Sequence, residues 1–513
     1  MTAGTSPDRW FSLGARIVAC YEEERDDSRA VWILLALFVA AWTLFQIIAF
    51  APVCLHDDML EVFAWSRHPS AGYGKHPPLA PSVAAAWFAI FPAANWSFEL
   101  LATLNAAVAL FAVDLIARRY VAPDRRLLVL LFLLLTPFYQ FHSQRFSPNA
   151  VLLSTWPIAT YCFLRAFESR RVFWSLLAGA TAALAMLGKY YSVYLIAGFI
   201  AAALQHPRRG DYLRSPAPWL SILAGFVVLA PHLAWLVKAG PSPFRYALAG
   251  HVPSSAADEL VKTLLYAAGG LAYVALPVAA YLLALRPDRR LLAATLWPDD
   301  PDRRMLVVLL AVPLILPMLT APIIGVILTP LWTMSGWFLL PIILLSPAEL
   351  IVRRAATMRV ALAVAIVSAV VLAAAPVVAW HNFAAEAANG RVCCRSASDA
   401  LTRAWHEATG RPLTLVFGDS ALAQGATFYG ADQPDSAPVF EWETPPWVTD
   451  ARRANEGFAV ICFAADRACR AAAEASAAGR SGIIRIERDV TASFFGIASA
   501  SAKIALMMVP PQR

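Results

Sequence analysis

Long apolar runs, separated by short clusters of arginine, repeat through most of this chain. A helix of roughly twenty apolar residues crosses a bilayer, and only helices or closed barrels satisfy their backbone there. The chain of 513 residues is 59% hydrophobic and 15% charged, which is too apolar for a soluble protein. The runs lie near residues 31–51, 97–117, 127–141, 149–166, 172–188, 190–205, 217–237, 260–285, 305–328, 334–351 and 359–380. They predict a polytopic α-helical membrane protein with about eleven spans.

The arginine clusters occupy alternate loops between these runs. They are Arg118–Arg119 with Arg125–Arg126, Arg170–Arg171, Arg208–Arg209, Arg286 with Arg289–Arg290 and Arg303–Arg304, and Arg353–Arg354. Basic loops face the cytoplasm, so residues 1–30 are expected to be a cytoplasmic tail, and the loop after the first run and everything after residue 380 are expected outside. The net charge of +7 then reflects topology, and no nucleic-acid partner is expected.

Charge is concentrated in the first outer loop. Asp57, Asp58, Glu61, Lys75 and His76 lie close together there, directly after an apolar run. Asp58 and Glu61 are three residues apart and would share one face of a short helix. Acidic and basic groups gathered at a membrane boundary favour a functional site, and the alternative is a solvated loop that only links two spans.

Aromatic residues and prolines give this loop the character of a packed segment. Phe63, Trp65 and Tyr73 interleave with the charges, and the Pro77–Pro78 pair stiffens the exit of the loop. The apolar stretch 79–91 that follows is too short to cross a bilayer, so we expect an interfacial helix beside the site.

The first loop also resembles a known family. It reads Asp58-Met59-Leu60-Glu61, then Trp65-Ser66, then Gly72-Tyr73-Gly74-Lys75-His76-Pro77-Pro78-Leu79. This order is similar to the first periplasmic loop of bacterial family-39-type membrane glycosyltransferases of the C-type superfamily, relatives of protein O-mannosyltransferases and of the lipid A aminoarabinose transferase. The resemblance covers residues 50–200 best and implies a catalytic acid or base at Asp58, counted back from Trp65. Many relatives carry Asp-Glu where this chain has Asp58-Met59, so the resemblance leaves Asp57 or Glu61 as the second carboxylate.

The resemblance implies a donor whose sugar is linked to a lipid phosphate. We expect the cations that bind this phosphate in the outer loops. Lys75 and His76 are two candidates, and the resemblance leaves open which of them meets phosphate. Arg145 lies in an outer loop where relatives carry basic or polar residues, and an arginine fork suits a phosphate ester. Lys189 is the fourth candidate, because relatives have a Lys-Tyr pair facing the outer cavity at this point. The alternative for Arg145 is an arginine whose guanidinium only reaches out to the membrane interface, and the alternative for Lys189 is a cation that only ends a helix.

Four residues are expected to line the substrate pocket, namely Trp65, Tyr73, Asn149 and Tyr190. Asn149 stands where many relatives have an acid, which argues against a carboxylate role there. Arg245, His251 and Lys262, in a longer outer loop, are expected to be surface cations.

A second domain begins at residue 381, after the membrane domain of residues 31–380. Stretches 413–417, 458–463 and 482–486 are typical of buried strands, and the alanine-rich stretch 464–479 is typical of a helix. We expect a small periplasmic α/β domain over residues 381–513. Phe417-Gly-Asp-Ser420 imitates a serine nucleophile motif, but no histidine follows His406 to serve as its base, so a structural turn is expected.

Four cysteines of this domain lie where oxidation is permitted. Cys462 could close on Cys469, or either could reach Cys393 or Cys394, and the sequence does not choose between these pairings. Zinc is disfavoured by the cysteine spacing, and neither a cofactor nor a metal is expected.

The favoured hypothesis is an inverting glycosyltransferase in the bacterial inner membrane. It would move a sugar from a polyprenyl-phosphate donor to a hydroxyl of an acceptor lipid, glycan or protein, at the periplasmic face. The rival is a transporter or lipid-carrier flippase, which would place ionisable groups at mid-membrane. The runs carry almost no charge beyond Asp114, which favours the enzyme. A third hypothesis is a membrane scaffold whose exported domain binds a partner.

Overall fold

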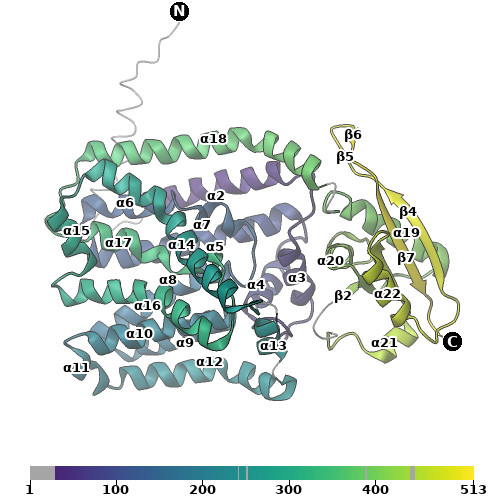
Figure 1. The fold of residues 1–513 in the computed structure, drawn as a ribbon, viewed down its shortest axis with the longest axis horizontal. Coiled ribbons are helices and arrows are strands. Elements are labelled where there is room, and N and C mark those ends of the chain that lie inside the picture. The colour runs from purple at the N-terminus through teal and green to yellow at the C-terminus, as the bar shows by residue number, and fades with distance from the viewer. Residues whose placement is uncertain (1–28, 241, 250–251, 387–389, 439–444, 513) are drawn as a thin grey trace, which may run out of the picture.

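Figure 1 shows the computed structural model, which describes residues 29–240, 242–249, 252–386, 390–438 and 445–512. A large helical bundle lies beside a smaller domain of mixed helix and sheet, built from the end of the chain. The predicted tail at residues 1–30 falls almost wholly outside the described residues.

The bundle contains a helix within every one of the apolar runs. Its long helices are α2 (Arg29–Ala49), α5 (Asn95–Tyr120), α8 (Val151–Ser169), α9 (Val172–Gly188), α10 (Val193–Gln205), α12 (Ala217–Ala239), α14 (Ala256–Leu285), α16 (Pro301–Ile324) and α18 (Arg354–Glu386). Shorter pieces are α6 (Pro123–Leu133), α7 (Pro137–Gln140), η1 (His142–Gln144), η2 (Tyr190–Ser192), α11 (Arg209–Leu213), α13 (Ser242–Ala249), α15 (Arg289–Leu296), η3 (Pro330–Ser335), η4 (Trp337–Leu339) and α17 (Leu340–Leu345). The predicted polytopic helical architecture is confirmed.

Length and composition separate these helices into two groups. Among the described residues, six helices are long and apolar enough to cross a membrane alone, namely α2, α5, α12, α14, α16 and α18. The segment 123–144 makes a seventh as a pair bent by 64°, with Pro137 at the start of its second part. The remaining apolar runs also form helices, but these are too short or not apolar enough to be counted as spans. The expected total of about eleven therefore includes broken and short segments.

Charge inside the spans is not limited to Asp114. That residue pairs with Arg118, at 2.7 Å between Oδ2 and Nε. Glu99, near the start of α5, is also buried, at 3% exposure. Glu99 lies within the apolar run 97–117 and was not anticipated as a buried charge.

The first loop folds into two short helices, α3 (Asp57–Ser66) and α4 (Leu79–Phe88). His56 caps α3 by accepting a hydrogen bond at Nδ1 from the amide of Asp58. The apolar face of α3, with Leu60 and Phe63, packs against α4 and the start of α5. α4 begins directly after the Pro77–Pro78 pair and has ten residues, as expected for a helix that does not span.

The C-terminal domain is built around one five-stranded sheet with the order β2-β1-β3-β7-β4. β1 is parallel to β2 and β3, whereas β7 is antiparallel to β3 and β4. Its elements are α19 (Cys394–Thr409), β1 (Leu415–Gly418), α20 (Ser420–Tyr429), β2 (Asp435–Pro438), α21 (Asp450–Asn455), β3 (Phe458–Phe463), α22 (Arg467–Ser476), β4 (Ile484–Val490), β5 (Ser493–Phe494), β6 (Ile497–Ala498) and β7 (Ala502–Val509). The three predicted strands and the predicted helix correspond to β1, β3, β4 and α22, while β2 and β7 were not foreseen.

The turn between β1 and α20 is structural, as its sequence predicted. Gly418 has φ +131°, and a Cβ there would lie 1.9 Å from the carbonyl oxygen of Ile461. Asp419 then caps α20 by accepting a hydrogen bond from the amide of Leu422 at 3.1 Å.

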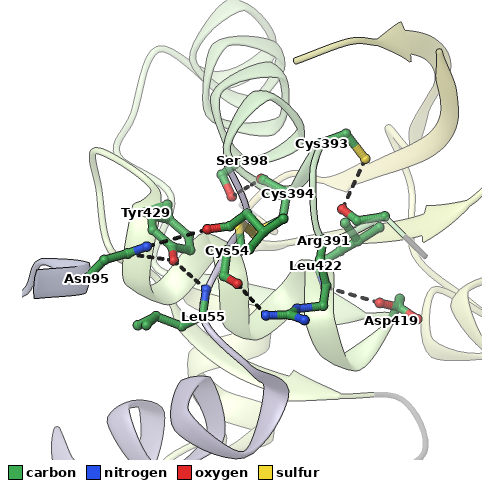
Figure 2. The surroundings of a disulfide bond; sticks show 12 residues. Cys54, Leu55, Asn95, Arg391, Cys393, Cys394, Ser398, Asp419, Leu422 and Tyr429 are labelled. Atoms are coloured by element: carbon green, nitrogen blue, oxygen red, sulfur yellow. Dashed lines mark hydrogen bonds between the residues drawn. A yellow bond between two sulfur atoms is a disulfide. The ribbon is translucent and has the colours of Figure 1, made fainter. Parts of the chain in front are cut away.

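Two disulfides form among the described cysteines. Cys462 and Cys469 pair with each other, which is one of the predicted alternatives. Cys394 pairs with Cys54, at the end of the first apolar run, and this partner was not anticipated (Figure 2). Arg391 adds two hydrogen bonds to Cys54, through its carbonyl oxygen and its guanidinium. The second domain is therefore covalently tied to the segment just before α3.

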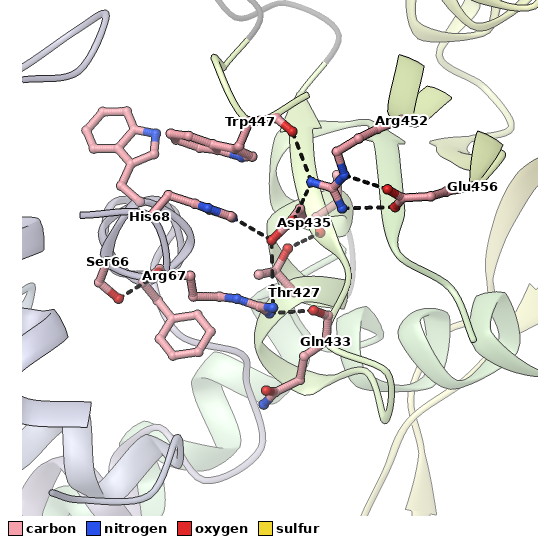
Figure 3. Close-up of polar contacts among 12 residues, drawn as sticks. Ser66, Arg67, His68, Thr427, Gln433, Asp435, Trp447, Arg452 and Glu456 are labelled. Atoms are coloured by element: carbon pink, nitrogen blue, oxygen red, sulfur yellow. Dashed lines mark hydrogen bonds and ion pairs between the residues drawn. The ribbon is translucent and has the colours of Figure 1, made fainter. Parts of the chain in front are cut away.

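A polar network makes a further contact between the two parts (Figure 3). Asp435 accepts hydrogen bonds from Nε2 of His68 at 2.7 Å and from Arg452 at 2.9 Å. Arg67 lies 3.7 Å from the same carboxylate, and the ring of His68 stacks on Trp447. Burial alone would raise the pKa of Asp435, but these hydrogen bonds outweigh it and hold the pKa below its ordinary value.

Candidate active site

Two aspartates open helix α3 beside the C-terminal domain. Asp57 and Asp58 occupy the first turn, where the positive end of the helix dipole stabilises negative charge. The side chain of Asp58 is 52% exposed, and the basic residue within 4.0 Å of its carboxylate among the described residues is His56, at 3.6 Å between Nδ1 and Oδ2. Burial lowers the pKa of His56, with Asp58 and Asp57 opposing and Arg145 adding to the shift. The exposed side chain of Arg145 is therefore close to the start of α3.

Glu61 and Lys75 form a largely buried ion pair. Nζ of Lys75 lies 2.5 Å from Oε1 of Glu61, and the two side chains are 19% and 14% exposed. Burial raises the pKa of Glu61, while the charge of Lys75 and its hydrogen bond oppose the rise. The i,i+3 spacing sets Glu61 one turn after Asp58, so the pair adjoins the exposed carboxylate.

Tyr246 of α13 covers the basic end of the loop. Its ring centre is 5.9 Å from Nζ of Lys75 and 5.6 Å from the imidazole of His76. His76 also meets Trp65 edge to face, at 6.2 Å between ring centres. The basic pair is therefore enclosed by aromatic rings, which hold cations without neutralising them.

Lys189 and Asn149 meet on the other wall of the site. Nζ of Lys189 donates to Oδ1 of Asn149 at 2.6 Å and lies 4.7 Å from the ring centre of Trp332. Burial lowers the pKa of Lys189 to about 8, and the negative charge of Asp58 opposes that shift. Asp58 and Lys189, far apart in sequence, are thus electrostatic neighbours.

Trp65 and Tyr73 shape the loop that carries Lys75. Their rings stack at 5.0 Å, and the hydroxyl of Tyr73 lies 3.1 Å from the carbonyl oxygens of both Trp65 and His68. Burial raises the pKa of Tyr73 to about 12, which keeps the hydroxyl protonated. Both residues are almost fully buried and act here as walls.

These walls enclose part of a cavity of about 560 Å³. Trp235 of α12 forms one side, Trp447 of the C-terminal domain forms another, and Lys75 faces the space between them. Gly72 permits this arrangement, because a Cβ at that position would lie 2.3 Å from Trp235. The cavity offers aromatic surfaces, the ammonium group of Lys75 and the imidazole of His68, in a size range that suits a small organic group.

Tyr190 connects the wall that carries Lys189 and Asn149 to the first loop. Its hydroxyl lies 2.9 Å from Nε2 of His232, and Nδ1 of His232 lies 2.7 Å from the carbonyl oxygen of Ala71. The ring of Tyr190 also stacks on Phe244. Tyr190 therefore braces the loop in this structure.

The structure gathers the residues proposed from the sequence into two groups. Asp57, Asp58, Glu61, Lys75, His76, Trp65 and Tyr73 belong to the first loop, while Asn149, Lys189 and Tyr190 lie on the wall formed by α8, α9 and η2. Arg145 stands beside the start of α3. Sequence reasoning missed the aromatic residues that enclose the basic groups, which are Trp235, Tyr246, Trp332 and Trp447. Trp235 lies inside an apolar run and Trp447 lies in the C-terminal domain, so no local signal marked them as parts of the site.

Comparison with known proteins finds a matching family model and similar solved structures. Residues 75–235 match the family model described as dolichyl-phosphate-mannose-protein mannosyltransferase. No curated protein sequence matches the chain. The crystal structure of ArnT from Cupriavidus metallidurans bound to undecaprenyl phosphate has a TM-score of 0.58 at 12% identity, covering 93% of this chain and 98% of that chain. Its apo form gives 0.56 at 12% identity, covering 94% and 98%. The family model and the shared fold agree with the resemblance to family-39-type membrane glycosyltransferases, which is thereby confirmed.

Proposed function

We propose that this protein is an inverting glycosyltransferase that moves a sugar from a polyprenyl-phosphate carrier to a hydroxyl acceptor. The observation that carries the proposal is an exposed carboxylate, Asp58, beside two largely buried lysines, Lys75 and Lys189. The match to a mannosyltransferase family model supports sugar transfer, and the fold shared with an ArnT structure that holds undecaprenyl phosphate supports a lipid phosphate as partner. These comparisons do not favour a transporter or flippase.

The reaction needs one base and one cation site. The acceptor oxygen attacks the anomeric carbon, its proton passes to the carboxylate of Asp58, and the bond from the anomeric carbon to the phosphate oxygen breaks. The leaving group departs as polyprenyl phosphate, with both electrons of that bond. A single displacement inverts the anomeric centre. Asp57, one residue earlier, is the less direct candidate for the base.

The departing phosphate gains negative charge, and preorganised cations stabilise it most strongly in the transition state. Lys75 and Lys189 are the principal candidates, because both are held by short contacts within the site. Glu61 orients Lys75 through their ion pair, and Asn149 orients Lys189. His76 and Arg145 remain candidates at the edges of the same region. These cations need no metal ion to assist them.

The cavity of about 560 Å³ is the proposed binding site of the acceptor or of the transferred sugar. Its walls are the rings of Trp65, Tyr73, Trp235 and Trp447. The apolar face of a sugar packs well on such rings, while its hydroxyls reach polar groups at the rim. The C-terminal domain, residues 381–513, would then complete the site built by residues 31–380.

The proposed location is the bacterial inner membrane, with the active site and the C-terminal domain in the periplasm. The arginine clusters support this orientation. A reporter that is active only outside the cytoplasm should be active when fused after residue 380 and inactive when fused after Arg171. The opposite pattern would mean that the proposed orientation in the membrane is wrong.

The reaction itself is tested with the purified protein and a synthetic polyprenyl-phosphate sugar. Release of polyprenyl phosphate that depends on a hydroxyl acceptor, together with a product of inverted anomeric configuration by NMR, is the expected result. A product with retained configuration, or lipid movement without cleavage of the donor, would contradict the proposal.

A further inference from the structure

A second cavity, mostly apolar but lined by one acidic and one basic side chain, lies apart from the active site, between the end of α2, the start of α5 and the C-terminal domain. Its volume is about 360 Å³. It shares none of its lining residues with the cavity of Lys75 and Trp447. Its lining includes Ile47, Phe50, Trp96, Glu99, Arg395 and Tyr429.

Glu99 supplies the acidic side of this cavity. Its side chain is 3% exposed, and its Oε2 has no hydrogen-bond partner among the described residues. A buried carboxylate oxygen without a donor is costly, because it has lost water and gained nothing in return. Glu99 is one of the residues that line the cavity, so a ligand in the cavity would lie beside this carboxyl group.

Arg395 supplies the basic side. It is the second residue of α19, and its guanidinium lies 5.0 Å from the ring centre of Tyr429. Its positive charge acts on Glu99, yet within the described chain no ion pair within 4.0 Å joins the two side chains. The cavity therefore presents a carboxylate and a guanidinium that are separate from each other and face the same space.

The cavity lies at the membrane boundary. Ile47 and Trp96, on the spanning helices α2 and α5, are 39% and 43% exposed. Exposed apolar side chains on spanning helices face lipid, and tryptophan is enriched where the bilayer meets water. A ligand can therefore place a polar head in the cavity while its chains run along α2 and α5.

We propose that this cavity binds the headgroup of an amine-bearing zwitterionic phospholipid, such as phosphatidylethanolamine. The primary ammonium would donate to the unpartnered carboxylate of Glu99, and the phosphate would accept from Arg395. A choline head has a cation but no N–H donor for Glu99. A glycerol head has a phosphate but no cation.

The site adjoins a joint between the two domains. The hydroxyl of Tyr429 accepts from the amide of Leu55 at 2.8 Å and donates to Oδ1 of Asn95 at 2.9 Å (Figure 2). Leu55 lies two residues before α3, and Arg395 follows the disulfide-bonded Cys394. A lipid held by Glu99 and Arg395 would therefore brace the segment from which Asp57 and Asp58 project.

The test is lipid binding to the delipidated full-length protein by native mass spectrometry. Dioleoyl phosphatidylethanolamine, phosphatidylcholine and phosphatidylglycerol are titrated in parallel. The wild type should bind the ethanolamine lipid about tenfold more tightly than the choline lipid, since one charge-assisted hydrogen bond distinguishes them. Glu99→Gln should bring that ratio close to one, and Arg395→Ala should weaken both lipids. Arg403→Ala, an exposed arginine on the same helix α19, is the matched control and should change neither.

Two results would overturn the proposal. One is equal or tighter binding of phosphatidylglycerol by the wild type, which would mean an anion site. The other is an unchanged ratio of ethanolamine to choline lipid in Glu99→Gln. If Arg395→Ala does not fold, the ratio measured in Glu99→Gln decides alone, because that substitution keeps the size and shape of the side chain.

Discussion

Nζ of Lys75 and Oε1 of Glu61 are 2.5 Å apart, in a pair of side chains that are each less than one-fifth exposed. Lys75 also faces the aromatic cavity. An ammonium group has three donors, so Lys75 can keep Glu61 and still reach a phosphate. Lys75 is therefore a preorganised cation. The carboxylate of Glu61 fixes its position and need not touch the substrate.

Removing only one member of this pair should destabilise the protein. Lys75→Met leaves the carboxylate of Glu61 buried without its cation, and we expect the free energy of unfolding to fall by about 1–3 kcal/mol. The double variant Lys75→Met/Glu61→Gln should recover part of that loss. Thermal unfolding in detergent measures both, with the exposed Lys503→Met as control. A double variant as unstable as the sum of the single variants would contradict the coupling.

The pH dependence of turnover should report Lys189. Burial lowers its pKa to about 8, so its ammonium form is complete well below that pH and is lost as the pH rises through it. We expect kcat/KM to fall above pH 8, and Lys189→Arg to keep its activity to higher pH. Lys189→Ala should lower turnover more than donor affinity, by about 2–4 kcal/mol in activation free energy. A profile that is the same in wild type and Lys189→Arg would remove this residue from the phosphate site.

Gly72→Ala should damage the aromatic cavity without touching a charge. The new Cβ would lie 2.3 Å from the ring of Trp235, so the ring must move. We expect a higher KM for the acceptor and a changed tryptophan fluorescence spectrum. Gly210→Ala is the control, because a Cβ there meets nothing within 4 Å. An unchanged KM in Gly72→Ala would mean that the acceptor does not bind in this cavity.

The contact between the domains should weaken in acid. The pKa of Asp435 is held below its ordinary value, so its contribution to stability is complete above the unfolded pKa of about 4 and is lost as the pH falls through the folded value. Asp435→Asn should therefore lower thermal stability at pH 7 and make a smaller difference near pH 3. Asp450→Asn, whose side chain is 95% exposed, should have no effect at either pH. An equal loss from Asp435→Asn at both values would exclude the ionised contact.

The sequence predicted the fold well because its strongest signals are local. Apolar length marks a span, and alternating arginine clusters indicate its direction. β1 and β3, whose apolar runs are continuous, were also predicted, although β7 was missed despite its apolar run 504–509. β2 was missed because Asp435-Ser-Ala-Pro438 has almost no apolar residue, and its place in the sheet comes from pairing with β1.

The site was predictable only in part, because several of its contacts join residues far apart in the chain. The charged residues of the first loop stand out where charge is scarce. Nothing in the sequence shows that Lys75 pairs with Glu61 and not with another acid, or that Cys54 reaches Cys394 across 340 positions. The enclosing ring of Trp235 lies in an apolar run that indicates only a membrane span, and the ring of Trp447 lies in a polar segment of the C-terminal domain, far from the first loop in the chain.

The most direct test of the account is the transfer activity of Asp58→Asn, measured with a polyprenyl-phosphate sugar and matched expression. Loss of the base should lower turnover at least 100-fold, in the range of general base catalysis, while donor binding is retained. Asp57→Asn should keep a measurable fraction of the activity, and Glu61→Gln should be intermediate through the loss of orientation of Lys75. Normal turnover in Asp58→Asn together with loss in Asp57→Asn would move the base by one residue, and normal turnover in both would contradict a carboxylate-driven transfer at α3.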